Sequence, residues 1–209
     1  MKLNVIVAYD RRNGGIGDDN GLMWRLSGDI NNFKSITTGG IVVMGRKTWE
    51  TIPDKFKPLP NRTNIILSSN ASELRQKPEF QQENVSVFSS LDELFECYLK
   101  NITDKNIFII GGGTIYTQIL TDYSHLIDRI YTTEVYNVPK TVEYTSNFPM
   151  KSMKSKAPKL AKSKARVSCI EVHSLIRSHS FSIFFAEYRI ELLRIVSFPV
   201  CVSQSSIRL

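Results

Sequence analysis

The segment VVMGRKTWETIP, residues 42–53, places a glycine and two cations directly after an apolar run. Gly45 ends that run, and Arg46, Lys47 and Thr48 would form the first turn of the next helix. A helix start carries unpaired backbone N–H groups and the positive end of the helix dipole, so each cation there disfavours the helix by roughly 0.3–1 kcal/mol. A bound phosphate would offset that cost through the arginine fork and the threonine hydroxyl. The alternative interpretation is a solvated cation pair.

A second apolar run with a glycine tip, IIGGGTIY, lies at residues 109–116. Gly111, Gly112 and Gly113 carry no side chain that would keep a ligand away from the backbone. The run lacks the lysine of a P-loop and the GxGxxG spacing. Two such helix starts in one small domain suit the pyrophosphate of a dinucleotide. Ser68 and Ser69, with the two cations, would add a site for a further phosphate, which favours NADP over NAD.

Asp29 is the candidate catalytic residue. It lies in a predicted helix that follows a glycine-rich loop, Gly14–Gly17, which we expect to be mobile. Phe33, four residues on, shares its helix face, and Ile30 and Ile36 make that face apolar. A carboxylate there is costly to bury unless it is paired, so it could hold an amidine-like group. The alternative is an ordinary first-turn acid that favours the helix dipole.

The elements around these residues alternate. Strands are predicted at 3–9, 41–44, 63–67, 85–88, 107–110 and 129–136, and helices at about 27–37, 46–52, 71–77, 90–100 and 114–121. Ser90 and Glu93 have the spacing of a capping box. This order predicts the α/β class, with a central, mostly parallel twisted sheet and helices on both faces. Ligands of such sheets bind beyond the carboxyl ends of the strands.

Composition and charge limit the function classes. The 209 residues contain no run of 18 apolar residues, so no membrane span is predicted. The three cysteines, Cys97, Cys169 and Cys201, are too dispersed for a disulfide framework or a zinc site, and Cys97 is predicted to be a core residue. Residues 151–209 hold eleven lysines and arginines against three glutamates, so residues 1–150 carry about −1 of the net +7. The basicity therefore belongs to the tail, and a nucleic-acid function is not expected for residues 1–150.

The motifs together resemble dihydrofolate reductase. The matching segments are IVAYDRRNGGIGDDNGLMWRLSGDINNFK, IVVMGRKTWETIP, PLPNRTNIILSS, FIIGGGTIYTQIL and DRIYTTEV, in the order and spacing of that family, over about residues 3–136. The resemblance implies NADPH-dependent reduction of 7,8-dihydrofolate to 5,6,7,8-tetrahydrofolate, which supports one-carbon metabolism and thymidylate synthesis. It also implies a monomeric, cytoplasmic antifolate target without a metal.

The resemblance also implies roles by position. Asp29 would hold the pterin, Thr133 would bond to Asp29, and Trp24 would hold a water beside them. The folate would contact Ile6, Val7, Asp29, Phe33, Thr51, Ile52, Leu59, Arg62, Ile110 and Thr133, with Arg62 clamping the glutamate α-carboxylate. NADPH would contact Ala8, Ile16, Gly45, Arg46, Lys47, Thr48, Leu67, Ser68, Ser69, Ile110, Gly111, Gly112, Gly113, Thr114, Ile115 and Tyr116. A cis peptide would join Gly111 and Gly112, and the loop Gly14–Met23 would be a lid over the nicotinamide.

The chain departs from the family at three places. Met23 replaces the usual proline before the tryptophan, and the aspartate that braces the lid is missing or displaced in YNVPKTVEYTSNFPM. We expect a catalytic domain at 1–150 and a basic, divergent segment at 151–209. Residues 165–174 and 185–194 are candidates for the family's last two strands. The alternative is an unrelated tail, arising from divergence, altered splicing or a shifted reading frame.

Two other functions stay open at this point. One is a reductase of the same fold that acts on another pterin or a ribityl-pyrimidine. The other is a rearranged, inactive protein that binds a ligand, or RNA through its basic tail. That tail also suits nuclear entry or binding to a polyanion.

Overall fold

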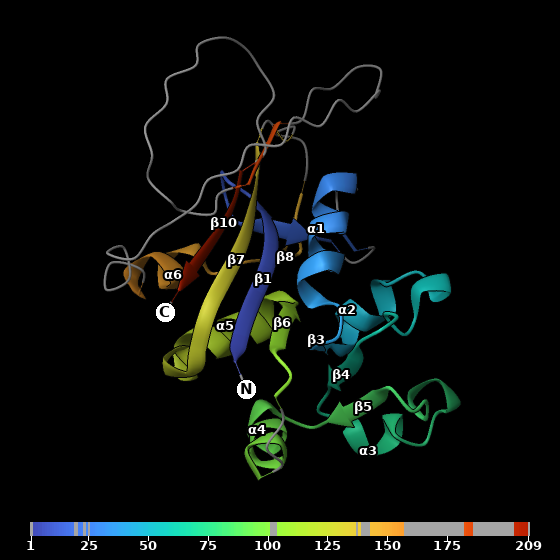
Figure 1. The fold of residues 1–209 in the computed structure, drawn as a ribbon. Coiled ribbons are helices and arrows are strands. Elements are labelled where there is room, and N and C mark those ends of the chain that lie inside the picture. The colour runs from blue at the N-terminus through green and yellow to red at the C-terminus, as the bar shows by residue number, and fades with distance from the viewer. Residues whose placement is uncertain are drawn as a thin grey trace, which may run out of the picture.

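The computed structural model describes residues 2–18, 21–22, 24, 26–100, 104–136, 138, 143–156, 182–185 and 203–208. Figure 1 shows the two longest strands, β1 and β7, side by side at the centre of the molecule.

The main sheet contains six parallel strands. They are β1 (Leu3–Asp10), β3 (Ile41–Gly45), β4 (Thr63–Leu67), β5 (Val85–Phe88), β6 (Ile107–Gly111) and β7 (Ile127–Tyr136). Their order in space is β7-β1-β6-β3-β4-β5. All six were predicted within two residues at each end, because short apolar runs between turn residues are typical of parallel strands. The prediction of the α/β class with a mostly parallel sheet is confirmed.

Helices cover both faces of this sheet. α1 (Ser27–Thr37), α2 (Arg46–Thr51) and α3 (Ala71–Leu74) lie on one face, where Trp49, Ala71 and Leu74 pack with Val42, Met44 and Ile66. α4 (Leu91–Lys100), α5 (Gly113–Asp122) and α6 (Met150–Lys156) lie on the other, where Leu94, Ile119 and Met153 join Val5, Ile41 and Val43. Neighbours along β3 therefore alternate between two cores, as the period of a strand requires. Three short 3-10 helices lie in the connections between these elements, at Asp54–Phe56, Pro78–Phe80 and Ser124–Leu126.

A second, two-stranded sheet lies beside the main one. The glycine-rich segment predicted to be a loop contains strand β2 (Gly15–Gly17), which pairs antiparallel with β8 (Ser146–Asn147). Three residues with two glycines form a weak strand signal despite Ile16, so the partner strand decides their conformation.

Two strands pair antiparallel with β7. β9 (Ser182–Phe185) pairs with Thr133–Tyr136, and β10 (Ser203–Arg208) pairs with Arg129–Glu134. Of the two candidate strands, 165–174 lies outside the described residues, and of 185–194 only Phe185 is described, as the last residue of β9. The polar sequence SQSSIR of β10 does not show the apolar alternation that would predict a strand.

Two predictions about α4 need correction. Cys97 is exposed rather than part of the core. The Ser90 hydroxyl accepts a hydrogen bond from the Glu93 backbone N–H at 3.1 Å, as in a capping box, but the Glu93 carboxylate bonds to the N–H and hydroxyl of Ser89, both at 2.6 Å. The reciprocal bond has therefore moved one residue towards the N-terminus.

Candidate active site

The carboxyl ends of three neighbouring strands meet at one edge of the sheet. Gly45 at the end of β3 pairs with Leu67 at the end of β4, and Met44 pairs with Gly111 at the end of β6. The two glycine tips seen in the sequence are therefore adjacent in space. A Cβ atom added at Gly45 would lie 3.4 Å from Ile115 and 3.9 Å from the Gly111 carbonyl oxygen.

Helices α2 and α5 both begin at this edge. A Cβ at Gly112 would lie 3.2 Å from the Thr48 hydroxyl, so the first turn of α2 faces the glycine triplet. The N-cap residues of α2 and α5, Gly45 and Gly112, supply no side-chain cap, and of the first N–H groups of α5 that of Gly113 is bonded to the Ser146 hydroxyl. Uncapped backbone N–H groups beside bare glycines can take a diphosphate. The peptide between Gly111 and Gly112 is cis, as the family resemblance implied.

The cations of α2 lie on its exposed side. Arg46 forms an ion pair with Glu50, one helical turn on, at 2.7 Å, and Lys47 is exposed. Beside them, the Ser68 hydroxyl accepts a hydrogen bond from the Asn70 N–H at 3.2 Å, and Ser69 is exposed. A further phosphate would meet these hydroxyl and cationic groups, with Glu50 competing for Arg46.

Asp29 lies half-buried in the first turn of α1 and faces β7. Thr133, which is 3% exposed, donates its hydroxyl hydrogen to Asp29 Oδ1 at 2.6 Å. The contact joins residues 104 positions apart and is the one that the resemblance implied. The threonine fixes one carboxylate oxygen, which orients the group to accept paired N–H donors from a ligand.

Tyr116 lies near both the Asp29 carboxylate and the glycine triplet Gly111–Gly113. Its hydroxyl donates to the Ile6 carbonyl at 2.7 Å, and a Cβ at Gly111 would lie 3.2 Å from its ring. Burial, and then the nearby charge of Asp29, raise the pKa of Tyr116. The acid and the glycine triplet therefore both lie near Tyr116.

Arg62 is a buried guanidinium on the same side as Phe33. It is 7% exposed, bonds to the Thr37 hydroxyl at 3.2 Å and to the Pro60 carbonyl at 2.9 Å, and lies 5.6 Å from the centre of the Phe33 ring. No carboxylate of the described residues lies within ion-pairing distance of it. Burial lowers the pKa of Arg62, so an anionic ligand would be favoured there.

Trp24 is buried, at 7% exposure, in a small cluster with Val135 and Val138. Its indole N–H has no hydrogen-bond acceptor in the part of the chain that the structure describes. A buried N–H normally has a partner, so this group suits a donor to a ligand or to a bridging water.

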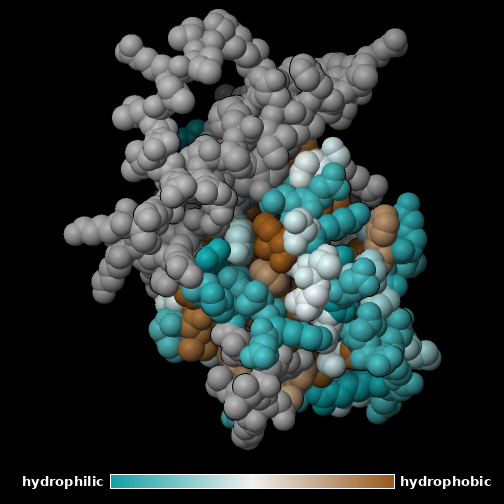
Figure 2. All heavy atoms as spheres, in the orientation of Figure 1, coloured by the Kyte–Doolittle hydropathy of each residue, from teal (hydrophilic) through white to brown (hydrophobic). Residues whose placement is uncertain are grey.

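The remaining predicted contacts divide between the two faces of the sheet. Ile6, Ile52, Leu59 and Ile110 pack half-buried on the α1–α2 face, the face of Arg62 and Phe33, and hydrophobic side chains reach the surface beside α1 (Figure 2). Val7 points into the opposite core, so its side chain does not share that face and only its backbone could reach the same ligand. Ala8 pairs with Thr133, Thr51 touches Gly21 of the predicted lid, Ile16 is buried, and Thr114 is exposed.

Ser146 was not among the predicted site residues. Its hydroxyl accepts a hydrogen bond from the Gly113 N–H at 3.2 Å, so β8 touches the start of α5. One of the first N–H groups of that helix is therefore already paired with a side chain. No short motif marks a contact across 33 residues.

The described ranges contain no group of three or more His, Cys, Asp or Glu side chains that could hold a metal, and none of their helices has the length and apolar character of a membrane span.

Comparison with known proteins agrees with this geometry. The family model described as dihydrofolate reductase matches residues 2–169. A dihydrofolate reductase of Schistosoma mansoni is 40% identical over 141 residues, which cover 65% of this chain and 73% of that protein. One of Candida albicans is 36% identical over 166 residues, covering 74% of this chain and 80% of the relative.

A solved structure shares the fold. The dihydrofolate reductase from Enterococcus faecalis, complexed with NADP(H) and RAB-propyl, superposes with a TM-score of 0.61 at 22% identity and covers 99% of this chain and 95% of its own. With the family model spanning most of the sequence, the chain belongs to the dihydrofolate reductase family.

Proposed function

We propose that this chain catalyses the NADPH-dependent reduction of 7,8-dihydrofolate to 5,6,7,8-tetrahydrofolate. The observation that carries the proposal is the Asp29–Thr133 pair, which lies near Tyr116, the residue packed against Gly111 of the glycine triplet. A carboxylate that accepts N–H donors and an adjacent diphosphate site are what a pterin and a reduced dinucleotide require. Family membership points to the same reaction.

Each group has a defined task. The reduced nicotinamide supplies a hydride when NADPH is bound. Asp29 holds the amino group and ring N–H of the pterin, Thr133 orients Asp29, and Trp24 offers its N–H to a water on the proton path. Arg62 pairs with the glutamate carboxylate of the substrate. The protein's contribution is therefore to position the reactants and to provide a site with little water.

Asp29→Asn tests the proposal. Asparagine keeps the shape but cannot pair as a negative acceptor with two N–H donors, so we expect turnover of dihydrofolate to fall by roughly two orders of magnitude or more. NADPH affinity should stay near the wild-type value, because the phosphate-binding groups are untouched. Loss of NADPH absorbance measures turnover, and NADPH fluorescence measures binding.

The control is Asp104→Asn, an exposed aspartate in the loop before β6, which should leave both quantities unchanged. Wild-type turnover in Asp29→Asn, or an equal loss in the Asp104 variant, would contradict the assignment of Asp29.

The finer features belong to the same proposal. We infer that the reaction supports one-carbon metabolism and thymidylate synthesis in the cytoplasm, that the chain is a monomer, and that the basic tail could carry nuclear entry or nucleic-acid binding. An antifolate that presents a diaminopteridine, such as methotrexate, should compete with dihydrofolate for Asp29. Asp29→Asn should weaken its inhibition far more than Asp104→Asn, as measured by the inhibitor concentration that halves turnover.

A further inference from the structure

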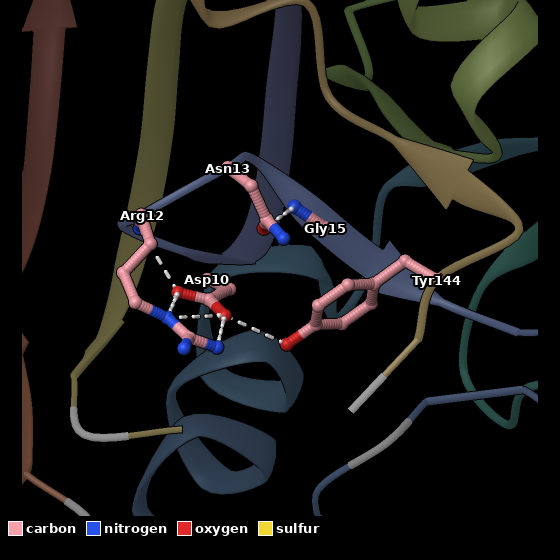
Figure 3. Close-up of polar contacts among 5 residues, drawn as sticks. All are labelled: Asp10, Arg12, Asn13, Gly15 and Tyr144. Carbon is pink, nitrogen blue, oxygen red and sulfur yellow. Dashed lines mark hydrogen bonds and ion pairs between the residues drawn. The ribbon is translucent and has the colours of Figure 1, made fainter. Parts of the chain in front are cut away.

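Asp10, the last residue of β1, is a buried acid that the proposed reaction does not use. It is fully buried, and its carboxylate accepts hydrogen bonds from Arg12 Nη2 at 2.6 Å, from the Arg12 backbone N–H at 2.9 Å and from the Tyr144 hydroxyl at 2.9 Å (Figure 3). A buried carboxylate is tolerated only when it is paired in this way. Tyr144, 134 residues away, supplies the long-range partner.

The ring of Tyr144 lies directly on the predicted lid. A Cβ atom added at Gly15 would come within 2.3 Å of Tyr144 Cγ, so the ring occupies the space that any side chain at Gly15 would need. The Asn13 side chain accepts a hydrogen bond from the Gly15 N–H at 2.9 Å beside it (Figure 3). The Tyr144 ring also packs against Trp24 in a T-shaped arrangement, with the ring centroids 6.2 Å apart.

The segment after Tyr144 connects the lid to the cofactor edge. The Thr145 and Phe148 N–H groups donate to the carbonyls of Gly17 and Gly14, at 3.2 and 2.8 Å. Ser146, between them, accepts from the Gly113 N–H at the start of α5. Five consecutive residues thus touch the lid, Trp24 and the glycine triplet, with the Tyr144–Asp10 bond holding their first residue to β1.

We propose that Tyr144 is a positioning residue for hydride transfer: its hydroxyl on Asp10 and its ring on Gly15 hold the lid and Trp24 against the site. This inference rests on the proposed function. Burial, and then the hydrogen bond to Asp10, raise the pKa of Tyr144. The Tyr144 hydroxyl therefore keeps its proton and remains a hydrogen-bond donor to Asp10. Burial alone would raise the pKa of Asp10, but the bonds from Arg12 and Tyr144 outweigh burial and lower it.

Tyr144→Phe removes the hydroxyl and keeps the ring. We expect the single-turnover rate of hydride transfer to fall roughly tenfold, the scale of one lost charge-assisted hydrogen bond, with the KM for NADPH within about twofold of wild type. The isotope effect of deuterated NADPH on kcat should rise, because the transfer step becomes more rate-limiting. Asp10→Asn should have a similar effect, and the double variant should be no slower than either single variant.

Tyr123→Phe is the matched control. Tyr123 also donates to an aspartate, Asp92, at 2.6 Å, but it lies at the far end of α5 from Gly113. Its loss should leave hydride transfer and the isotope effect unchanged. An unaltered transfer rate in Tyr144→Phe, an equal loss in Tyr123→Phe, or losses that multiply in the double variant would overturn the proposal.

Amide hydrogen exchange separates this inference from the proposed function, because it needs no turnover. In the NADPH complex of the full chain, Tyr144→Phe should speed exchange at Gly15 and Gly17 several-fold, while Tyr123→Phe should not. Unchanged exchange in Tyr144→Phe would overturn the role of Tyr144. A wild-type chain that does not reduce dihydrofolate would instead overturn the proposed function.

Discussion

Arg62 holds its guanidinium buried between the Thr37 hydroxyl and the Pro60 carbonyl. Those two contacts use Nε and Nη1, and an arriving carboxylate can pair with the N–H groups of Nη1 and Nη2 that they leave. Arg62 is held by groups that do not touch Asp29, so it should affect the binding of the substrate more than the chemical step.

Arg62→Lys tests that separation. Lysine keeps the charge but loses the planar fork, so we expect the KM for dihydrofolate to rise roughly tenfold or more, with kcat little changed. A dihydropterin without the glutamyl tail is the control substrate, because it carries no carboxylate for Arg62. If the variant loses as much activity on this substrate, Arg62 supports the structure rather than the carboxylate.

Among individual residues, the pairing of Asp29 with Thr133 was predicted only through the family resemblance. From the residues alone, an aspartate in a first helical turn has an ordinary alternative, and only the 2.6 Å contact with Thr133 shows its direction. Tyr144 could not be predicted. Its importance arises from the missing side chain at Gly15 and from an acid 134 residues away, and neither leaves a local pattern.

Among the elements, the start of α4 is capped by Ser90 and Glu93, although the Glu93 carboxylate bonds to Ser89 rather than to Ser90. The Glu93 carboxylate binds the Ser89 hydroxyl and N–H and the Arg75 guanidinium, the last at 2.8 Å. The Ser89 contacts first, and then Arg75, lower the pKa of Glu93 to about 2. The folded state therefore binds the ionised form more strongly than the unfolded chain does.

Glu93→Gln should consequently destabilise the protein in a pH-dependent way. A lowered folded-state pKa contributes stability above the unfolded pKa, near 4.5, and loses it as the pH falls towards about 2. Because the side chain is 39% exposed, solvent screening limits the loss at pH 7 to about 0.5–1 kcal/mol. Urea unfolding at neutral and acidic pH measures the difference, which should shrink in acid.

Glu96→Gln, an exposed glutamate of the same helix, is the control and should change little. A loss from Glu93→Gln that is the same at both pH values would show that shape, rather than charge, matters at the cap.

The elements themselves were largely predictable, and the physical reason is periodicity. Buried parallel strands such as Ile41–Gly45 and Ile107–Gly111 are short apolar runs with glycine at the end, and this signal is local. The strands that the sequence did not reveal, Gly15–Gly17, Ser146–Asn147 and Ser203–Arg208, are glycine-rich or polar. Their conformation comes from the strand they pair with, which no local pattern encodes.

For the whole molecule, the relevant fact is that β7 is paired along both sides, and β9 adds a further pairing at Thr133–Tyr136. β1 pairs along one side, with Ala8 opposite Thr133, and β10 pairs along the other, with Gln204 opposite Thr133 (Figure 1). The strand that orients Asp29 therefore depends on residues 71 positions further along the chain, in the segment where the family resemblance had faded. Without that partner, the part of β7 at residues 129–132, which β9 does not pair with, would be an open edge with unpaired backbone groups.

Proline substitution in β10 tests whether the tail supports the site. In an antiparallel pair, successive residues alternate between pointing their N–H at the partner and away from it, so of Ser205 and Ser206 only one donates to β7. Proline at the donating position removes a ladder bond, and we expect a loss of about 1–3 kcal/mol in stability together with slower turnover. Proline at the other position is the matched control and should be milder. Thermal unfolding and dihydrofolate turnover are measured for both variants: if both behave as wild type, β10 does not hold β7, and the catalytic part of the chain is independent of β10.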